Sequence, residues 1–134
     1  MSRTIQGHKG IGAKITGVAL VASDNFSARY DLDRVKGVFS RKAHALHGER
    51  YVDRVLVLDT AKGGVTTSWM LREMKLRGMA PAALLLNSAN PIMAQGAAFA
   101  DLAFMDHFAE DITQIIKTGD TVTVDPRIGV VVVA

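Results

Sequence analysis

The stretch DTAKGGVTTSW, residues 59–69, combines the residue types that bind an anion. Gly63 and Gly64 have no side chains, so backbone N–H groups around them could approach a ligand closely. Hydroxyl residues follow, and a helix beginning near Thr66 would add the partial positive charge of its N-terminus. The pattern predicts a site for a carboxylate or a phosphate, with candidate residues Lys62, Gly63, Gly64, Thr66, Thr67 and Ser68.

A purely structural interpretation of the same residues stays open. The glycines suit a tight turn, Thr66 or Thr67 could cap a helix, and Lys62 could be a solvated surface charge. The stretch is not a nucleotide-binding P-loop, because the order Gly-Lys-Ser/Thr at the spacing of that motif is absent.

The residues that commonly bind metals show no ligand spacing. His44 and His47 lie close together in a segment without a predicted helix, and His8 and His107 are far from both. We therefore expect surface or capping roles for the histidines. The chain contains no cysteine, so it can form neither a disulfide nor a thiolate-bound cluster, and any iron–sulfur chemistry must come from a partner.

Length and composition predict a single domain, residues 1–134, with one real hydrophobic core. The net charge is only +3 and aromatic residues make up 6% of the chain, so we expect no nucleic-acid partner. No window approaches the roughly 18 apolar residues of a membrane span, and residues 1–12 contain no secretion signal. We expect a cytoplasmic protein without membrane contact.

The strands that must position the loop follow from the apolar pattern. Residues 55–58 and 82–86 are short all-apolar runs, typical of strands covered on both faces. Residues 24–50 form a long excursion of isolated apolar positions among charged ones. Further strands are predicted at residues 15–22, 37–40, 102–105, 121–124 and 128–133, the last two as a hairpin.

Two helices are predicted between these strands. Residues 66–77 carry apolar side chains at helical spacing, with Trp69, Met70 and Met74 expected in the core and Gly78 as the stop. Asn90 and Pro91 predict the cap and first residue of the second helix. The alternation of strand and helix predicts an α/β fold, a mixed sheet or barrel with helices on one side.

Six short segments form an ordered series along the chain: HALHG (44–48), RVLVL (54–58), KGGVTTS (62–68), GMAPAALLL (78–86), NPIMAQGA (90–97) and IKTGDTVTVD (116–125). In this order they resemble the aconitase X swivel domain, from about residue 14 to the C-terminus. The resemblance implies the swivelling β/β/α fold of aconitases, carried here as a separate small subunit.

The resemblance also implies an activity and a partner. The activity is that of a hydro-lyase (dehydratase) that removes water from a small hydroxy acid, such as phosphorylated mevalonate or cis-3-hydroxyproline. The partner is a large subunit that holds an iron–sulfur cluster and most substrate ligands, so we expect the isolated chain to be inactive. In the family, the cluster iron acts as a Lewis acid on the leaving hydroxyl, and a swivel-domain serine takes the proton beside the carboxylate.

The loop departs from the family pattern where this chemistry is expected. The family reads approximately Gly-x-Gly-Ser, followed by Gly-Ser two or three residues later. Here Gly64 stands at the first serine, Thr67 replaces the later glycine, and Ser68 matches the second serine. Elsewhere, Ala45 and Asn90 stand where the family has a proline and an aspartate.

Three interpretations of this departure stay open. Ser68 is the first candidate for the catalytic hydroxyl, with Thr66 and Thr67 as alternatives after a local shift. The subunit could instead serve a different substrate or reaction. The third interpretation is a non-catalytic anion-binding or interaction module that keeps the swivel fold.

Overall fold

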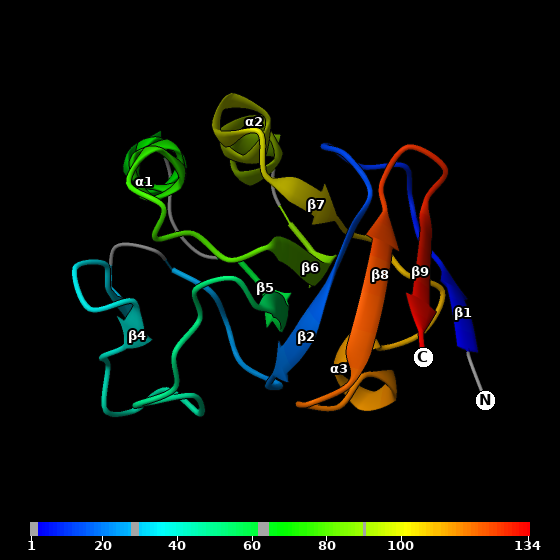
Figure 1. Ribbon diagram of the computed structural model, residues 1–134, viewed down its shortest axis with the longest axis horizontal. Helices are drawn as coiled ribbons and strands as arrows, with labels where there is room; N and C mark the ends of the chain where they lie inside the picture. Colours follow the sequence, from blue (N-terminus) through cyan, green and yellow to red (C-terminus); the bar gives the residue numbers. More distant parts are fainter. Residues whose placement is uncertain (1–2, 28–29, 62–64, 90) are drawn as a thin grey trace.

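The computed structural model describes residues 3–27, 30–61, 65–89 and 91–134, which form a curled sheet with two helices over one face (Figure 1). Within these residues, one sheet has the strand order β1-β9-β8-β2-β5-β6-β7. The bounds are β1 Arg3–Gln6, β2 Ile15–Val21, β5 Val55–Thr60, β6 Ala83–Ser88, β7 Ala103–Met105, β8 Thr121–Asp125 and β9 Val130–Val133. The predicted α/β class and mixed sheet are confirmed.

The parallel half of the sheet carries the two long helices. α1 (Val65–Leu76) crosses from β5 to β6, and α2 (Pro91–Ala100) crosses from β6 to β7. Leu56 and Leu58 face these helices, Val55 and Val57 face the opposite side, and all four are fully buried. Burial on both faces explains why the strand reads as a continuous apolar run. No helix in the described part of the chain is long and apolar enough to cross a bilayer.

The antiparallel half builds a second core on the other face. β8 and β9 form the predicted hairpin, and β8 pairs with β2. A single-turn helix, α3 (Ile112–Ile115), places Ile112 in the same apolar cluster as Val55 and Val57. The two long helices thus lie on one side of the sheet, as predicted. The short helix α3 on the opposite face was not predicted from the sequence.

Residues 7–12 draw the ends of the curled sheet together. Gly7 donates its N–H to the carbonyl of Gly129 beside β9, whereas Ile11 exchanges two backbone hydrogen bonds with Phe104 of β7. Gly10 is tightly enclosed, because a Cβ there would lie 1.9 Å from the Phe104 carbonyl oxygen. This segment therefore ties β7 to the turn between β8 and β9, and it needs glycine to pass so near β7.

The apolar residues of α1 divide between the core and the solvent. Met74 is buried, as predicted, and Met70 packs partly buried against the same core cluster. The prediction that Trp69 belongs to the core is wrong: its side of the helix is open and 56% of the residue is exposed. Trp69 instead stacks on Phe99 of α2, with ring centroids 6.1 Å apart, a contact that helical spacing alone does not reveal.

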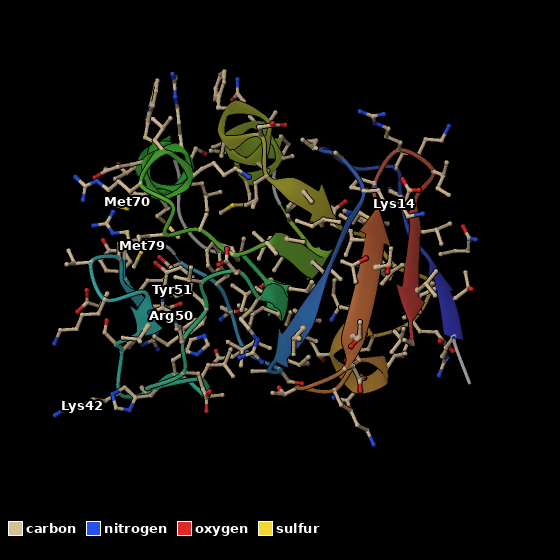
Figure 2. All side chains as sticks on the ribbon, viewed as in Figure 1. Lys14, Lys42, Arg50, Tyr51, Met70 and Met79 are labelled. Carbon is tan, nitrogen blue, oxygen red and sulfur yellow. The ribbon has the colours of Figure 1, made fainter. Side chains whose placement is uncertain are left out.

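The described residues of the excursion predicted at 24–50 fold, together with residues 51 and 52, as a lobe beside β5. The predicted strand near residue 38 is present as β4 (Val38–Phe39), which pairs with the unpredicted β3 (Leu32–Asp33). Figure 2 shows Tyr51 inside this lobe near Met79, with Lys42 at the outer edge. The buried Tyr51 hydroxyl has no hydrogen-bond partner among the described residues, and burial raises the pKa of Tyr51.

Candidate active site

Polar residues gather where β2, β5 and β6 end. Asp24 and Asn25 follow β2, Asp59 and Thr60 end β5, and Asn87 lies near the end of β6. These strands are parallel, so their carboxyl ends meet at one edge of the sheet. In open α/β sheets, ligands bind outside the carboxyl ends of the strands. The loop singled out from the sequence connects β5 to α1 and leaves from this same edge.

The structure describes only some of the predicted binding residues. Lys62, Gly63 and Gly64 lie outside the described residues, as does Asn90, the predicted cap of α2. Thr67 lies within α1, but its side chain is outside the description. Thr66 lies in the first turn of α1 and is exposed. Their binding roles stay predictions.

Ser68 lies between the two long helices. It is only 7% exposed, and its hydroxyl donates to the backbone carbonyl of Ile92 at 2.7 Å. Gly96 of α2 packs so closely that a Cβ there would lie 2.8 Å from the Ser68 Cβ. The Ser68 hydroxyl is therefore engaged in holding α1 against α2. Of the three candidates, only Thr66 and Ser68 have described side chains, and Thr66 is the exposed one of these two.

An amide bridge that sequence reasoning missed joins β5, β6 and α3. The Asn87 side-chain amide donates to Asp59 at 2.9 Å and to Asp111 at 2.7 Å, and its oxygen accepts the Ile112 N–H at 2.8 Å. Asp111 caps α3 by accepting the Thr113 N–H at 3.0 Å. The bridge fixes the end of β5 two residues before the loop. No spacing in the sequence signals it, because its members are distant along the chain.

Asp111→Ala should lower the free energy of unfolding by about 1 to 2 kcal/mol at pH 7, the usual cost of losing such a cap. Hydrogen bonds from the Thr113 hydroxyl and the Asn87 amide hold the pKa of Asp111 below its ordinary value. A lowered folded-state pKa gives stability that is present above the unfolded pKa, about 3.9, and is lost as the pH falls through the folded value.

Urea unfolding of the wild type and Asp111→Ala at pH 7 and at acidic pH measures this effect. The difference between the two proteins should shrink in acid. Asp111→Asn serves as the control, because it keeps an accepting oxygen and removes only the charge. A difference that is the same at both pH values would refute an ionised cap.

A surface or capping role was expected for His44, and the surface alternative is wrong. Its side chain is fully buried, Nδ1 accepts the Leu46 N–H at 3.0 Å, and Nε2 lies 2.7 Å from the Asn25 carbonyl oxygen. The carboxylates of Asp24 and Asp31 lie 3.8 and 3.9 Å from Nε2. Burial opposes ionisation of Asp24, but backbone N–H groups of residues 45 and 25 hold its pKa below the ordinary value. The available signal was the segment HALHG, which sequence reasoning treated only as a family marker.

A shallow cleft of about 480 Å³ opens beside Asn87. His8 and His107 lie in its wall with stacked rings, their centroids 4.9 Å apart. Nδ1 of His107 is 2.9 Å from a carboxylate oxygen of Asp106. Both histidines are exposed, in agreement with their predicted surface role.

The described residues of this chain offer no ligand set for the iron–sulfur cluster, which the family resemblance assigns to the large partner subunit. The described residues contain no group of three or more His, Asp or Glu side chains that could hold a metal ion. The full sequence has no cysteine, so thiolate ligands for an iron–sulfur cluster are absent.

The structure is a small mixed α/β domain with polar residues gathered at the carboxyl ends of its parallel strands, from which a connection with two glycines in its sequence leads to α1. The chain belongs to the aconitase X swivel-domain family, whose model matches residues 4–133. Among solved structures, aconitase X of Thermococcus kodakaraensis in its holo-form superposes with a TM-score of 0.91 at 26% identity, over 98% of both chains. The predicted swivel fold is confirmed.

Curated relatives sharpen this assignment. The phosphomevalonate dehydratase small subunit of Methanocella arvoryzae is 35% identical over 95% of this chain and 96% of its own length. The protein of the same name from Methanothrix thermoacetophila is also 35% identical, over 96% of this chain and 93% of its own length. These similarities place the chain among small subunits of aconitase X type hydro-lyases, as the sequence resemblance implied.

Proposed function

We propose that this chain is the cytoplasmic small subunit of a heterodimeric dehydratase that acts on phosphomevalonate or a close phosphorylated hydroxy acid. The observation that carries the proposal is the 35% identity to a phosphomevalonate dehydratase small subunit over nearly the full length of both chains. The large subunit would supply an iron–sulfur cluster and most substrate ligands, since this chain has no cysteine.

The contribution of this chain would be an anion site and a hydroxyl base. Lys62, Gly63 and Gly64 would present charge and backbone N–H groups to a carboxylate or phosphate. In the elimination, the base takes a proton from the carbon beside the carboxylate, the C–H electrons form the double bond, and the hydroxyl leaves from the neighbouring carbon. Assistance to the leaving hydroxyl would come from the partner subunit, as the family resemblance implies.

Thr66 is the hydroxyl that the geometry favours as the base. It is exposed in the first turn of α1, next to the glycines. Thr66 would first lose its own proton to solvent, and the positive end of the helix would stabilise the resulting alkoxide, which then takes the substrate proton and becomes a hydroxyl again. Ser68, the first choice from sequence, lies two residues further along α1. It is buried, and its hydroxyl donates a hydrogen bond to the Ile92 carbonyl. Thr67 stays an alternative.

A non-catalytic anion-binding module is the second candidate function. Two observations favour it: glycine stands at position 64, where the family has its serine, and the matching serine at position 68 is engaged between helices. Such a module would bind the same anions and the same partner without turning over the substrate.

Co-expression with a large aconitase X type subunit separates the two functions. The purified complex should contain iron and dehydrate phosphomevalonate, whereas the isolated chain should contain no cluster and show no activity. An iron-containing complex that binds phosphomevalonate but leaves it unchanged would support the binding module. Dehydration by the isolated chain would contradict both the shared site and the partner's role.

A further inference from the structure

His44 is held by two hydrogen bonds that fix its tautomer. Because Nδ1 accepts the Leu46 N–H, Nε2 carries the proton and donates it to the backbone carbonyl of Asn25 at 2.7 Å. The ring also stacks on Phe39, with centroids 4.6 Å apart. The buried imidazole therefore presents one donor in one direction, toward the segment that follows β2.

Asn25 links this donor to the end of β5. Its side-chain oxygen accepts the Thr60 hydroxyl at 2.5 Å, and the following residue, Phe26, donates its N–H to the Thr60 carbonyl at 2.8 Å. On the other side, Asp59 donates its N–H to the Asp24 carbonyl at 2.9 Å. Residues 24–26 are thus hydrogen-bonded to the last two residues of β5, which precede the glycine-rich connection.

The charged groups around His44 do not divert its donor. The Asp24 and Asp31 carboxylates lie beyond hydrogen-bond distance, at 3.8 and 3.9 Å from Nε2. Both carboxylates accept backbone N–H groups, and Asp31 also accepts a hydrogen bond from Arg41 at 3.1 Å. The Nε2 proton of His44 is therefore donated to the Asn25 carbonyl and not to either carboxylate.

We infer that His44 is a positioning residue for the proposed active site: through Asn25 and Thr60 it fixes the carboxyl end of β5, from which the chain continues to the first turn of α1 and Thr66. The inference rests on the proposed function, because positioning matters for turnover only if this loop takes part in catalysis. His44 is buried behind Asn25 and so acts on the site through these two residues. A displacement of about 1 Å at a reacting group can cost roughly 100-fold in rate.

Two substitutions separate the hydrogen bonds of His44. His44→Gln places an amide nitrogen near Nε2 and keeps the donor to Asn25, while the bond from Leu46 is lost. His44→Asn keeps an acceptor near Nδ1 for Leu46 and removes the donor to Asn25. Each variant loses the ring stacking on Phe39 and one hydrogen bond, so a purely structural role predicts similar losses of stability and turnover in both.

The positioning role predicts an asymmetry in the reconstituted complex. His44→Asn should lower kcat by roughly 10- to 100-fold, by the same displacement argument, whereas His44→Gln should stay within about threefold of the wild type. Thr60→Val should reproduce the loss and Thr60→Ser should not, because only serine keeps the hydroxyl. Combining His44→Asn with Thr60→Val should cost no more than the larger single loss, as expected for residues acting in one chain of contacts.

Amide hydrogen exchange in the full chain gives a second readout that does not depend on activity. His44→Asn should speed exchange at the Phe26 and Asp59 amides at least about tenfold, and His44→Gln should not, because the bonds of residues 24–26 to β5 open with loss of the donor. Equal turnover and equal exchange in the two His44 variants, or multiplicative losses in the double variant, would overturn the inference. A wild-type complex without dehydratase activity would instead refute the proposed function, and the exchange measurement would then decide the positioning role alone.

Discussion

Thr66→Ala should lower the turnover of the reconstituted complex by roughly 10²- to 10⁴-fold, the usual cost of removing a general base. The reason is positional: Thr66 is exposed in the first turn of α1, two residues after Gly64, while the Ser68 hydroxyl donates a hydrogen bond to the Ile92 carbonyl. Steady-state dehydration of phosphomevalonate measures the loss, and size-exclusion chromatography checks that the complex still assembles.

Three further variants serve as matched controls for Thr66→Ala. Thr66→Ser keeps the hydroxyl and should recover most of the turnover. Ser68→Ala should cost about 1 kcal/mol of stability, through the lost bond to Ile92, with turnover within about threefold. Thr67→Ala should resemble Ser68→Ala in turnover. A large loss of turnover in Ser68→Ala alone would show that Ser68, which matches the family serine, is the base instead of Thr66. Small losses of turnover in all three alanine variants would favour the binding module.

Gly96→Val should destabilise the chain by about 1 to 3 kcal/mol, the range for overpacking a well-filled contact. A Cβ at Gly96 would lie 2.7 Å from the Ser68 Cα and 2.9 Å from its hydroxyl oxygen, so α1 and α2 must separate. The separation should also break the Ser68 bond to Ile92 and displace the start of α1. Urea unfolding measures the stability, and turnover of the complex should fall as well.

Ala98→Val is the matched control, since Ala98 is exposed on the same helix and receives the same β-branched side chain. Helix propensity alone predicts that Gly96→Val stabilises α2, because glycine is the poorer helix former. If Gly96→Val is as stable as Ala98→Val, α1 and α2 can separate without loss of stability. That result would contradict a close contact between Gly96 and Ser68.

Much of the fold could be predicted from local patterns. The all-apolar run at residues 55–58 specifies a strand buried on both faces, and the predicted end of α1 is confirmed by Gly78, whose φ of +71° suits glycine. The missing cysteines settle that this chain supplies no thiolate ligands. Six ordered segments indicated the family, which the match over residues 4–133 confirms. These features are local or ordered along the chain, so the sequence alone carries them.

The tertiary structure decided which of those residues face one another. Helical spacing placed Ser68 on a helix and predicted Trp69 in the core. The close approach of Gly96 buries Ser68, whereas Trp69 lies at the surface, where it stacks on the ring of Phe99. His44 lacked ligand spacing, yet the return of the excursion to β5 buries it against Asn25. Side-chain periodicity describes one element at a time, whereas burial and hydrogen bonding depend on the neighbouring element, whose position is set by the packing of the whole chain.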